Sequence, residues 1–485
     1  MKRFAAVLLI TALLLSASAC GESENGKEVV TSGDAGTESA AVTEEDYGYV
    51  DPGLVKKDYD GRGFTILYPE WSLYNNYYFA DESNGEVVND ALYERARRVE
   101  EMFNIDFNYL TQGYIETIFP AVQKAVAAGL PDYDLALTHC ATSLTGYITS
   151  GIVMNWNEIP GADLSKPYWN QSVRENFEVD GVLPFMSSDY ILPDVNSIFF
   201  NKGMAEEYEL ENPYEIVLEG KWTWDALRKM AKAVSKDING DSIMDENDQY
   251  GFVAERGWQF GSVLTACGQS YLAKGNDGIP AIACNNEKTQ SVLEMITSLI
   301  YHDDISYTWE YNAAFDPNKG GKPPVDFGAN RSLFYLTPLS LATTFRDTEV
   351  DYGILPLPKY DETQKDYLTL NWAGFMCVPR SVSDPELVGF VTEMLAAESC
   401  RTVIPAFYDI LLGEKIARDD EAKQTLDIIF DNDVYDLGVN LSYYGIISSQ
   451  LSNDAPDNSA YIAKNAASIE KAISDYVKGC EDYNS

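Results

Sequence analysis

Oxygen-bearing side chains recur along a twelve-residue frame that begins at Asp237. EF-hand loops bind Ca²⁺ through side-chain oxygens at positions 1, 3, 5, 9 and 12 and through the backbone carbonyl of position 7. The spacing therefore predicts a bound Ca²⁺. Its six ligands, in chain order, are Asp237, Asn239, Asp241, Ile243, Asp245 and Asp248.

Two departures from the EF-hand pattern leave another interpretation open. Gly240 stands at position 4 rather than 6, and position 12 is Asp248 rather than a Glu that binds through both oxygens. A solvated Asp/Asn turn without metal uses the same residue types. Calcium sensors and dockerin-like modules need a second loop, and the chain has one such loop and no fixed-period repeat. If Ca²⁺ binds, we expect it to be structural.

A helix and a strand must position this loop. Thr223 can cap a helix that ends near Lys236, and a strand begins near Tyr250 in "YGFVAE". The apolar residues of the helix follow the i, i+3, i+4, i+7 spacing of one buried face: Leu227, Met230, Ala231 and Val234.

Short apolar strands alternate with amphipathic helices from Gly63 onward, which predicts an α/β fold with a mostly helical last third. Ligands of such sheets bind beyond the carboxyl ends of strands. We therefore expect binding residues at Glu70 and Trp71 after the first strand, and at His139 and Thr142 after the third. The expected strands are "FTILYP", "DFNYL", "YDLALTHC", "SIFFNK", "YGFVAE", "SLFYLTPL", "DYGILPLP" and "GFMCVPRS".

Composition excludes several classes of function. The 485 residues suggest at least two domains, and the net charge of -41 repels nucleic acid and anionic lipid surfaces. His139 and His302 are the only histidines and no CxxC pair occurs, so the usual zinc sites are excluded. Six scattered cysteines follow Cys20; many are expected to be buried as small apolar residues, and disulfide pairing stays open.

The N-terminus predicts export. Residues 1–19 combine Lys2 and Arg3 with an apolar run too short to span a membrane, and then small residues, as a signal peptide does. An ordinary signal peptidase could cleave after Ala19, but "LSASAC" also resembles a bacterial lipobox with Cys20 as the lipidated residue. Residues 20–57 are polar and acidic, which predicts a flexible tether. We expect a lipid anchor at the outer face of the cytoplasmic membrane and no other membrane contact.

The order of several motifs resembles the extracellular solute-binding proteins of carbohydrate ABC importers, the maltose-binding-protein-like family. After the lipobox, the motifs are "AGLPDYDLALT", "GADLSKPYWNQS", "SIFFNKGMAEEYELENPYE", "GKWTWDALRKMAKAVSKDINGDSIMDENDQYGF", "DFGANRSLFYLTPL", "DYGILPLPKYDETQ" and "PELVGFVTEML". The resemblance implies a two-lobed, type II periplasmic-binding-protein-like fold. Lobe 1 would span residues 58–188 and 373–412, and lobe 2 residues 189–372 and 413–485, with hinge crossings in "MSSDYILPDVN" and "LTLNWAGFM".

The resemblance also implies a ligand site between the lobes. Sugar sites pair aromatic plates with oriented polar groups. In the family register, Trp258 would stack on sugar, Trp372 would face the cleft at the second crossing, and Tyr443 or Tyr444 would supply another aromatic ring. Contacts from the first lobe would come from Glu70, Trp71, His139 and Thr142, and further polar contacts from Asp189 and Arg256.

These features predict a monomeric lipoprotein, not an enzyme, that captures a carbohydrate by hinge closure and delivers it to the permease of an ABC importer. An oligosaccharide is the expected ligand. Two alternatives stay open: a secreted glycoside hydrolase with paired carboxylates, and a surface adhesion module.

Overall fold

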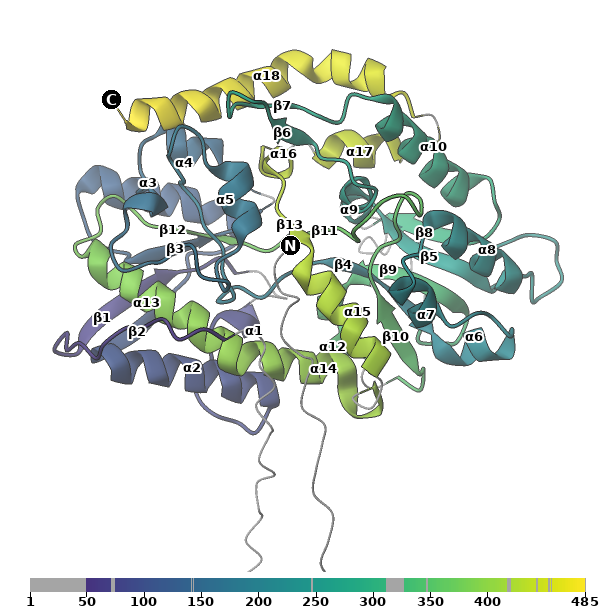
Figure 1. Ribbon diagram of the computed structural model, residues 1–485, viewed down its shortest axis with the longest axis horizontal. Coiled ribbons are helices and arrows are strands. Elements are labelled where there is room, and N and C mark those ends of the chain that lie inside the picture. Colours follow the sequence, from purple (N-terminus) through teal and green to yellow (C-terminus); the bar gives the residue numbers. More distant parts are fainter. Residues whose placement is uncertain are drawn as a thin grey trace, which may run out of the picture. The chain divides into compact units, whose positions relative to one another are not determined.

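Two β-sheets, one in each half of Figure 1, organise the chain. The computed structural model describes residues 49–484, except 71–74, 141, 143, 246, 311–326, 346–347, 417–419, 442–443, 452–453 and 455. All of these belong to one compact unit. The expected signal peptide, Cys20 and most of the expected tether lie outside the described residues.

The first sheet has the order β12-β3-β1-β2. Its central strand β1 (Arg62–Leu67) runs parallel to β2 (Ile105–Leu110) and β3 (Leu135–Thr138), and β12 (Phe375–Cys377) runs antiparallel to β3. Parallel neighbours need a crossover connection, which helices supply here. The helices of this half are α1 (Asn75–Tyr78), α2 (Val87–Phe103), α3 (Ile118–Ala128), α4 (Thr145–Thr149), α5 (Gln171–Phe177) and α13 (Pro385–Glu398).

The second sheet has the order β10-β4-β9-β5-β8. Strand β4 (Asn196–Asn201) runs antiparallel to β9 (Ser332–Pro338) and β10 (Tyr352–Leu355), whereas β5 (Tyr250–Arg256) is parallel to β9 and β8 (Ser306–Glu310). The helices of this half are α6 (Lys202–Glu207), α7 (Pro213–Leu218), α8 (Trp224–Val234), α9 (Trp258–Ala266), α10 (Glu287–Tyr301) and α12 (Ala342–Phe345).

Helix α8 and strand β5 are positioned as the sequence predicts. The Thr223 hydroxyl accepts a hydrogen bond from the Ala226 N–H at 3.2 Å, which caps the helix. The predicted apolar face is buried. Lys236 and Gln249 exchange backbone hydrogen bonds at the base of the loop, so the chain returns from α8 into β5.

Several segments connect the two halves. The first crossing leads into β4, and the second contains β11 (Thr369–Leu370), which pairs in parallel with β13 (Asp433–Val434). The last third is mostly helical, as expected: α13 is followed by a π-helical turn at Ser399–Val403 and then by α14 (Ile404–Ile416), α15 (Asp420–Asp431), α16 (Leu437–Asn440), α17 (Tyr444–Leu451) and α18 (Asn458–Tyr483).

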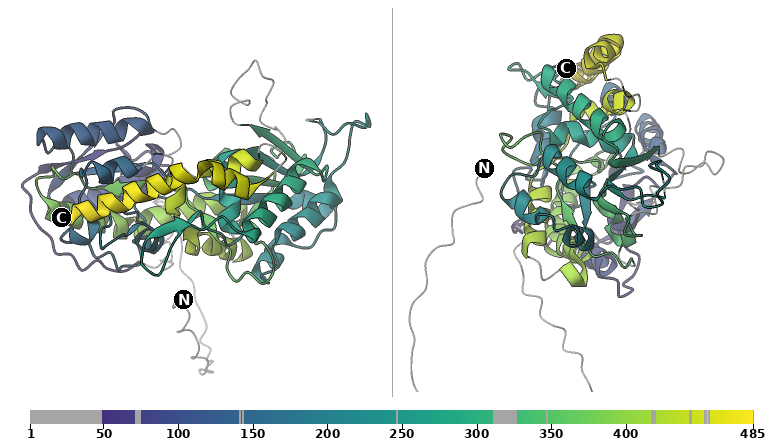
Figure 2. Two further views of the ribbon diagram at one scale, coloured as in Figure 1. Left: turned by 90° about the horizontal axis from the view of Figure 1, so that it is seen from above. Right: turned by 90° about the vertical axis from the view of Figure 1, so that its right-hand side faces the viewer.

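Helix α18 also links the halves. It packs on α10 and α17 of the second half and on α4 of the first, and it extends across both in Figure 1 and in the view from above in Figure 2. The Tyr476 hydroxyl donates to the Phe177 carbonyl at 2.8 Å. The strands of the first sheet come from residues 62–138 and 375–377, and those of the second from 196–355. The predicted lobe boundaries stay predictions.

All eight strands expected from sequence are present, and every described cysteine is buried. The strand β8 and the small hairpin of β6 (Leu272–Lys274) and β7 (Pro280–Ile282) were not predicted. None of the helices in the described part of the chain is both long and apolar enough to cross a membrane.

Candidate functional site

Four segments from both sheets and both crossings meet around one tryptophan, Trp372. His139 follows β3 of the first sheet, and Trp258 follows β5 of the second. Asp194 lies in the first crossing, just before β4, and Trp372 follows β11 in the second. Ligand sites of α/β proteins form beyond strand ends of this kind, so this junction is the candidate site.

Trp258 and Trp372 lie side by side at the junction. Their ring centroids are 5.5 Å apart and the ring planes are nearly perpendicular, at 85°. Such edge-to-face contacts add to the stabilisation that burial provides. Gly257 has a φ of 128°, which side-chain-bearing residues rarely adopt, and this allows β5 to turn directly into α9 with Trp258 as its first residue.

The two tryptophans differ in exposure. Trp372 is only 3% exposed, and its indole N–H donates to the Ser262 hydroxyl of α9 at 2.8 Å. A side chain on Gly261 would approach the Trp372 ring within 3.2 Å, so glycine makes room for this packing. Trp258 is only partly buried. In this structure Trp258 therefore offers the accessible aromatic surface, and Trp372 supports it from behind.

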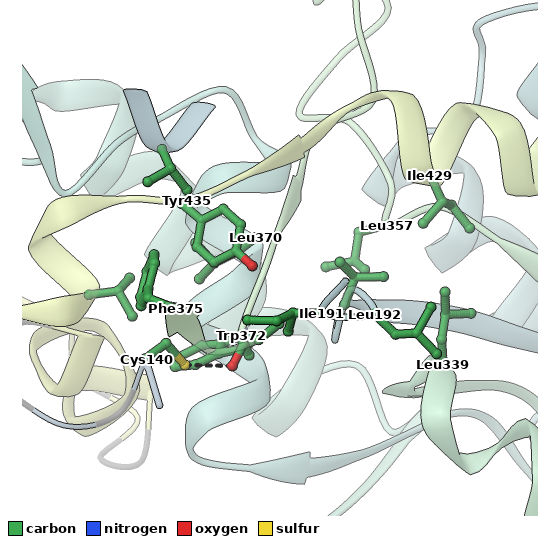
Figure 3. Packing of buried hydrophobic residues seen from close by; sticks show 14 of the residues in the cluster. Cys140, Ile191, Leu192, Leu339, Leu357, Leu370, Trp372, Phe375, Ile429 and Tyr435 are labelled. Carbon is green, nitrogen blue, oxygen red and sulfur yellow. Dashed lines mark hydrogen bonds between the residues drawn. The ribbon is translucent and has the colours of Figure 1, made fainter. Parts of the chain in front are cut away.

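Backbone contacts join Trp372 to both crossings. Its N–H donates to the Asp194 carbonyl at 2.7 Å, and the Asn371 side-chain oxygen accepts from the Asp194 N–H at 3.2 Å. The Asn371 amide donates to the Asp433 carboxylate of β13 at 2.6 Å. Figure 3 shows the apolar side chains that pack around these segments, among them Leu370 and Tyr435. The crossings thus form one hydrogen-bonded and well-packed hinge.

Two carboxyl groups of this hinge have raised pKa values. Burial raises the pKa of Asp194 to about 7. Burial also raises the pKa of Asp433 to about 6, although hydrogen bonds from Asn371 and Asn170 lower it. A low-polarity environment disfavours the charged form of each group.

The first sheet contributes His139 and the residues after it. The Cys140 thiol donates to the Trp372 carbonyl at 2.6 Å, the contact dashed in Figure 3. The Asn440 amide donates to the Cys140 carbonyl at 2.9 Å. The Thr142 hydroxyl donates to the His139 carbonyl at 2.7 Å. His139 is buried, and burial lowers its pKa to about 4, so its imidazole is neutral at pH 7.

The other predicted site residues either have backbone contacts elsewhere in the first half or lie outside the described residues. Glu70 is exposed at the end of the β1 segment, with its N–H bonded to the Gly113 carbonyl. The Asp189 N–H donates to the Tyr168 carbonyl in the first half. Neither of these contacts joins Glu70 or Asp189 to the tryptophan pair. Trp71 and Tyr443 lie outside the described residues, as do the side chains of Arg256 and Tyr444.

Comparison with solved structures identifies the fold. The substrate-binding protein Lmo0181 from Listeria monocytogenes, solved with cycloalternan, has a TM-score of 0.54 and 16% identity over 86% of this chain and 100% of its own. The GacH receptor of Streptomyces glaucescens, solved unliganded and with acarbose, has a TM-score of 0.56 and 14% identity over 86% and 99%. This chain has the two-lobed fold of ABC substrate-binding proteins. UgpB from Mycobacterium tuberculosis, in complex with glycerophosphocholine, also has this fold, with a TM-score of 0.55 and 14% identity over 85% and 99%. No protein-family model and no curated protein matches the sequence.

Sequence reasoning missed three residues of the junction: Asn196, Glu255 and Ser262. Glu255 had a signal, since it is an acidic residue at the end of the apolar strand "YGFVAE". Ser262 and Asn196 had none, because their role depends on the hydrogen bond between the Asn196 amide and the Ser262 hydroxyl at 2.8 Å, which joins α9 to β4.

The acidic loop before β5 is held by hydrogen bonds to its own backbone. The Asp237 carboxylate accepts from the N–H groups of Gly240 and Ser242 at 2.6 and 2.7 Å, which lowers its pKa. The buried Asp248 carboxylate accepts from Ile238 and Asp245 at 3.0 and 2.9 Å. No group of three or more His, Cys, Asp or Glu side chains in the described part of the chain is arranged to hold a metal. Calcium binding by this loop stays a prediction.

Proposed function

We propose that this protein captures a carbohydrate without chemical turnover and delivers it to an ABC importer. The observation that carries the proposal is the pairing of Trp258 with Trp372 where both sheets and both crossings meet. Sugars present apolar C–H faces that stack on aromatic rings, and polar rims that need oriented hydrogen-bonding groups. The partly exposed ring of Trp258 supplies the first, and hydrogen bonds with the buried Ser262 and Asp194 hold Trp372 behind it.

The similar structures support a polar, carbohydrate-like ligand. Lmo0181 was solved with cycloalternan and GacH with acarbose. UgpB, with the same fold, was solved with glycerophosphocholine, so the fold also accommodates polar ligands that are not oligosaccharides. For this chain, the tryptophan pair favours a saccharide.

Closure of the two lobes would report binding. A ligand that touches both lobes binds the closed form better than the open form and shifts the population toward it. Trp372 is suited to this coupling, because its carbonyl accepts from Cys140 of the first half while its indole donates to Ser262 of the second. We infer that the permease recognises the closed form.

The remaining features of the proposal follow from the N-terminus. We infer that residues 1–19 direct export, that Cys20 carries the lipid, and that residues 20–57 tether a monomer to the outer face of the cytoplasmic membrane. Mass spectrometry of the purified membrane form tests the anchor. A mature chain that begins at Cys20 without added lipid mass would refute it.

A thermal-shift screen tests the ligand class. A ligand that binds only the folded protein raises the melting temperature by mass action. We expect shifts with mono- or oligosaccharides that are lost in Trp258→Ala, and none with amino acids, peptides or polyols. Shifts with peptides alone would refute the carbohydrate assignment and preserve the closing mechanism.

The same preparation separates binding from hydrolysis and adhesion. Incubation with an oligosaccharide panel should leave every sugar intact, because the proposal needs no catalytic carboxylate pair. Turnover that disappears in Glu70→Gln would favour the hydrolase instead. Small-angle scattering should show compaction when a saccharide binds, and its absence with every small ligand would favour an adhesion module.

A further inference from the structure

Glu255 is a buried acidic side chain next to the tryptophan pair, and only 8% of its surface is exposed. It precedes the last residue of β5, and its N–H donates to the Gln259 side-chain oxygen at 3.0 Å. A hydrogen bond with Trp258 also holds its carboxyl group. The carboxyl oxygen Oε1 has no hydrogen-bond partner within the described part of the chain. An acceptor without a donor thus lies beside the accessible aromatic surface.

Two further side-chain oxygens, in residues joined to Trp372 by hydrogen bonds, are also acceptors without a donor. Asp194 Oδ1 and Asn196 Oδ1 are buried and have no partner among the described residues. Both residues belong to the hydrogen-bonded group around Trp372. The Asp194 carbonyl accepts from the Trp372 N–H, and the Asn196 amide donates to the Ser262 hydroxyl, which also accepts from the Trp372 indole. Buried polar atoms are nearly always bonded, so these acceptors call for a donor that the described residues do not supply. A ligand rich in N–H or O–H donors provides one.

Charge narrows the class of ligand. Neither Glu255 nor Asp194 has an ion-pair partner among the side chains that the structure describes, and burial raises the pKa of Glu255 to about 7. The titratable side chain that faces Glu255 from the adjacent strand β9 is Tyr335, whose own pKa is raised by burial and by Glu255. A cationic group would neutralise the Glu255 carboxylate and bond to Oε1 at once. A hydroxyl group would do only the second, and an anionic sugar would be repelled.

Resting on the function proposed above, we propose that Glu255 binds a protonated amino group of the ligand, so that the ligand is an amino-bearing saccharide. The ammonium group donates an N–H to Oε1 and keeps its own protons. Glu255 is protonated in the free protein below pH 7 and releases that proton to solvent when the ammonium binds. Binding of the protonated amine is therefore expected to weaken as the pH falls from 7 to 5.5.

Matched pairs of sugars test this role by isothermal titration calorimetry. The probes are oligomers of two to four glucosamine or galactosamine units, each compared with its N-acetylated form, in which the positive charge is absent. In at least one pair, we expect the amine to bind about 10- to 100-fold more tightly at pH 7, where the sugar amine still carries its proton, the size of effect typical of a hydrogen bond to a charged group. Glu255→Gln should abolish this preference. Glu219→Gln should preserve it, since Glu219 is exposed and pairs with Lys221.

Proton release supplies a measurement that does not depend on a variant. Titrations of the wild-type protein at pH 6, in two buffers of different ionisation enthalpy, should show up to one proton released per amine bound. Equal affinities for both members of each binding pair, or a preference unchanged by Glu255→Gln, would overturn the role of Glu255 and leave the proposed function standing. Binding of amine-free saccharides alone would likewise overturn the role of Glu255 and leave the proposed function standing. A complete lack of binding by every saccharide would overturn both.

Discussion

Replacing Asp194 with asparagine should change how the stability of the protein depends on pH. The Asp194 carboxyl is buried in the first crossing and its Oδ1 lacks a partner in the described structure, whereas its backbone N–H and carbonyl bond to Asn371 and Trp372. The substitution therefore removes the ionisable group and keeps the backbone bonds of the hinge.

The size of the effect follows from the pKa of Asp194. Burial raises this pKa from 3.8 to about 7, and each pKa unit corresponds to about 1.4 kcal/mol, so ionisation costs the folded state roughly 4 kcal/mol. Between these two pKa values the folded protein holds a proton that the unfolded chain has lost. The wild-type free energy of unfolding therefore falls as the pH rises from about 4 to about 7. Below pH 4 the carboxyl is neutral in both states and there is no cost.

Urea unfolding of both proteins at pH 4.5 and pH 8 measures this difference. We expect Asp194→Asn to gain roughly 3 kcal/mol relative to the wild type between the two pH values, because about 1 kcal/mol of the cost is already present at pH 4.5. An unbonded Asn amide would cost about 1–3 kcal/mol at both, so the change with pH is the informative quantity. Asp475→Asn, which removes an exposed carboxylate paired with Lys471, is the control and should show little change. A difference between Asp194→Asn and wild type that is the same at both pH values would refute the reasoning.

Three further predictions concern other parts of the chain. If the acidic loop binds Ca²⁺, EDTA should lower the melting temperature and Asp241→Ala should abolish the response; an unchanged melting temperature on calcium addition would leave only the metal-free turn. Trp258→Ala should weaken saccharide binding about tenfold or more in calorimetric titrations, and unaltered affinity would place the site elsewhere. Gly251→Ala should lower the free energy of unfolding in urea by about 1–3 kcal/mol, because the new Cβ would lie 2.2 Å from the Ala231 carbonyl oxygen. In the control variant Gly445→Ala, the new Cβ meets no atom within 4 Å and should have little effect. Equal effects of the two variants would contradict this packing argument.

Local patterns in the sequence predicted local structure well. The apolar periodicity and the capping Thr223 define α8 because both act within a few residues of chain. Strands β4 and β9 contain the apolar runs "IFF" and "LFYL", and such runs are typical of buried strands. The strand β8 was missed, since "SYTWE" alternates polar with aromatic residues and has a less apolar composition.

The site was predicted only in part, because its properties depend on contacts between distant residues. Resemblance to a known family selected Trp258 and Trp372, but no local pattern indicates that Trp372 is buried behind Trp258 or bonded to Ser262. Glu255 was missed although it is an acidic residue at the end of an apolar strand. Its importance lies in an oxygen that no described residue satisfies, and that depends on how β5, β9 and α9 pack together.

The hinge and the candidate site share Trp372, and this has a consequence for how binding could be sensed. The Trp372 N–H bonds to the first crossing, its carbonyl accepts from the first half, and its indole bonds to α9, where Trp258 begins. A ligand that shifts Trp258 must therefore change the packing of a residue that is bonded to both halves and to both crossings. Interiors packed this closely transmit small displacements, because few voids can absorb them. A sugar seated on one exposed ring can thus bias the whole hinge, which also contains the carboxyl groups of Asp194 and Asp433.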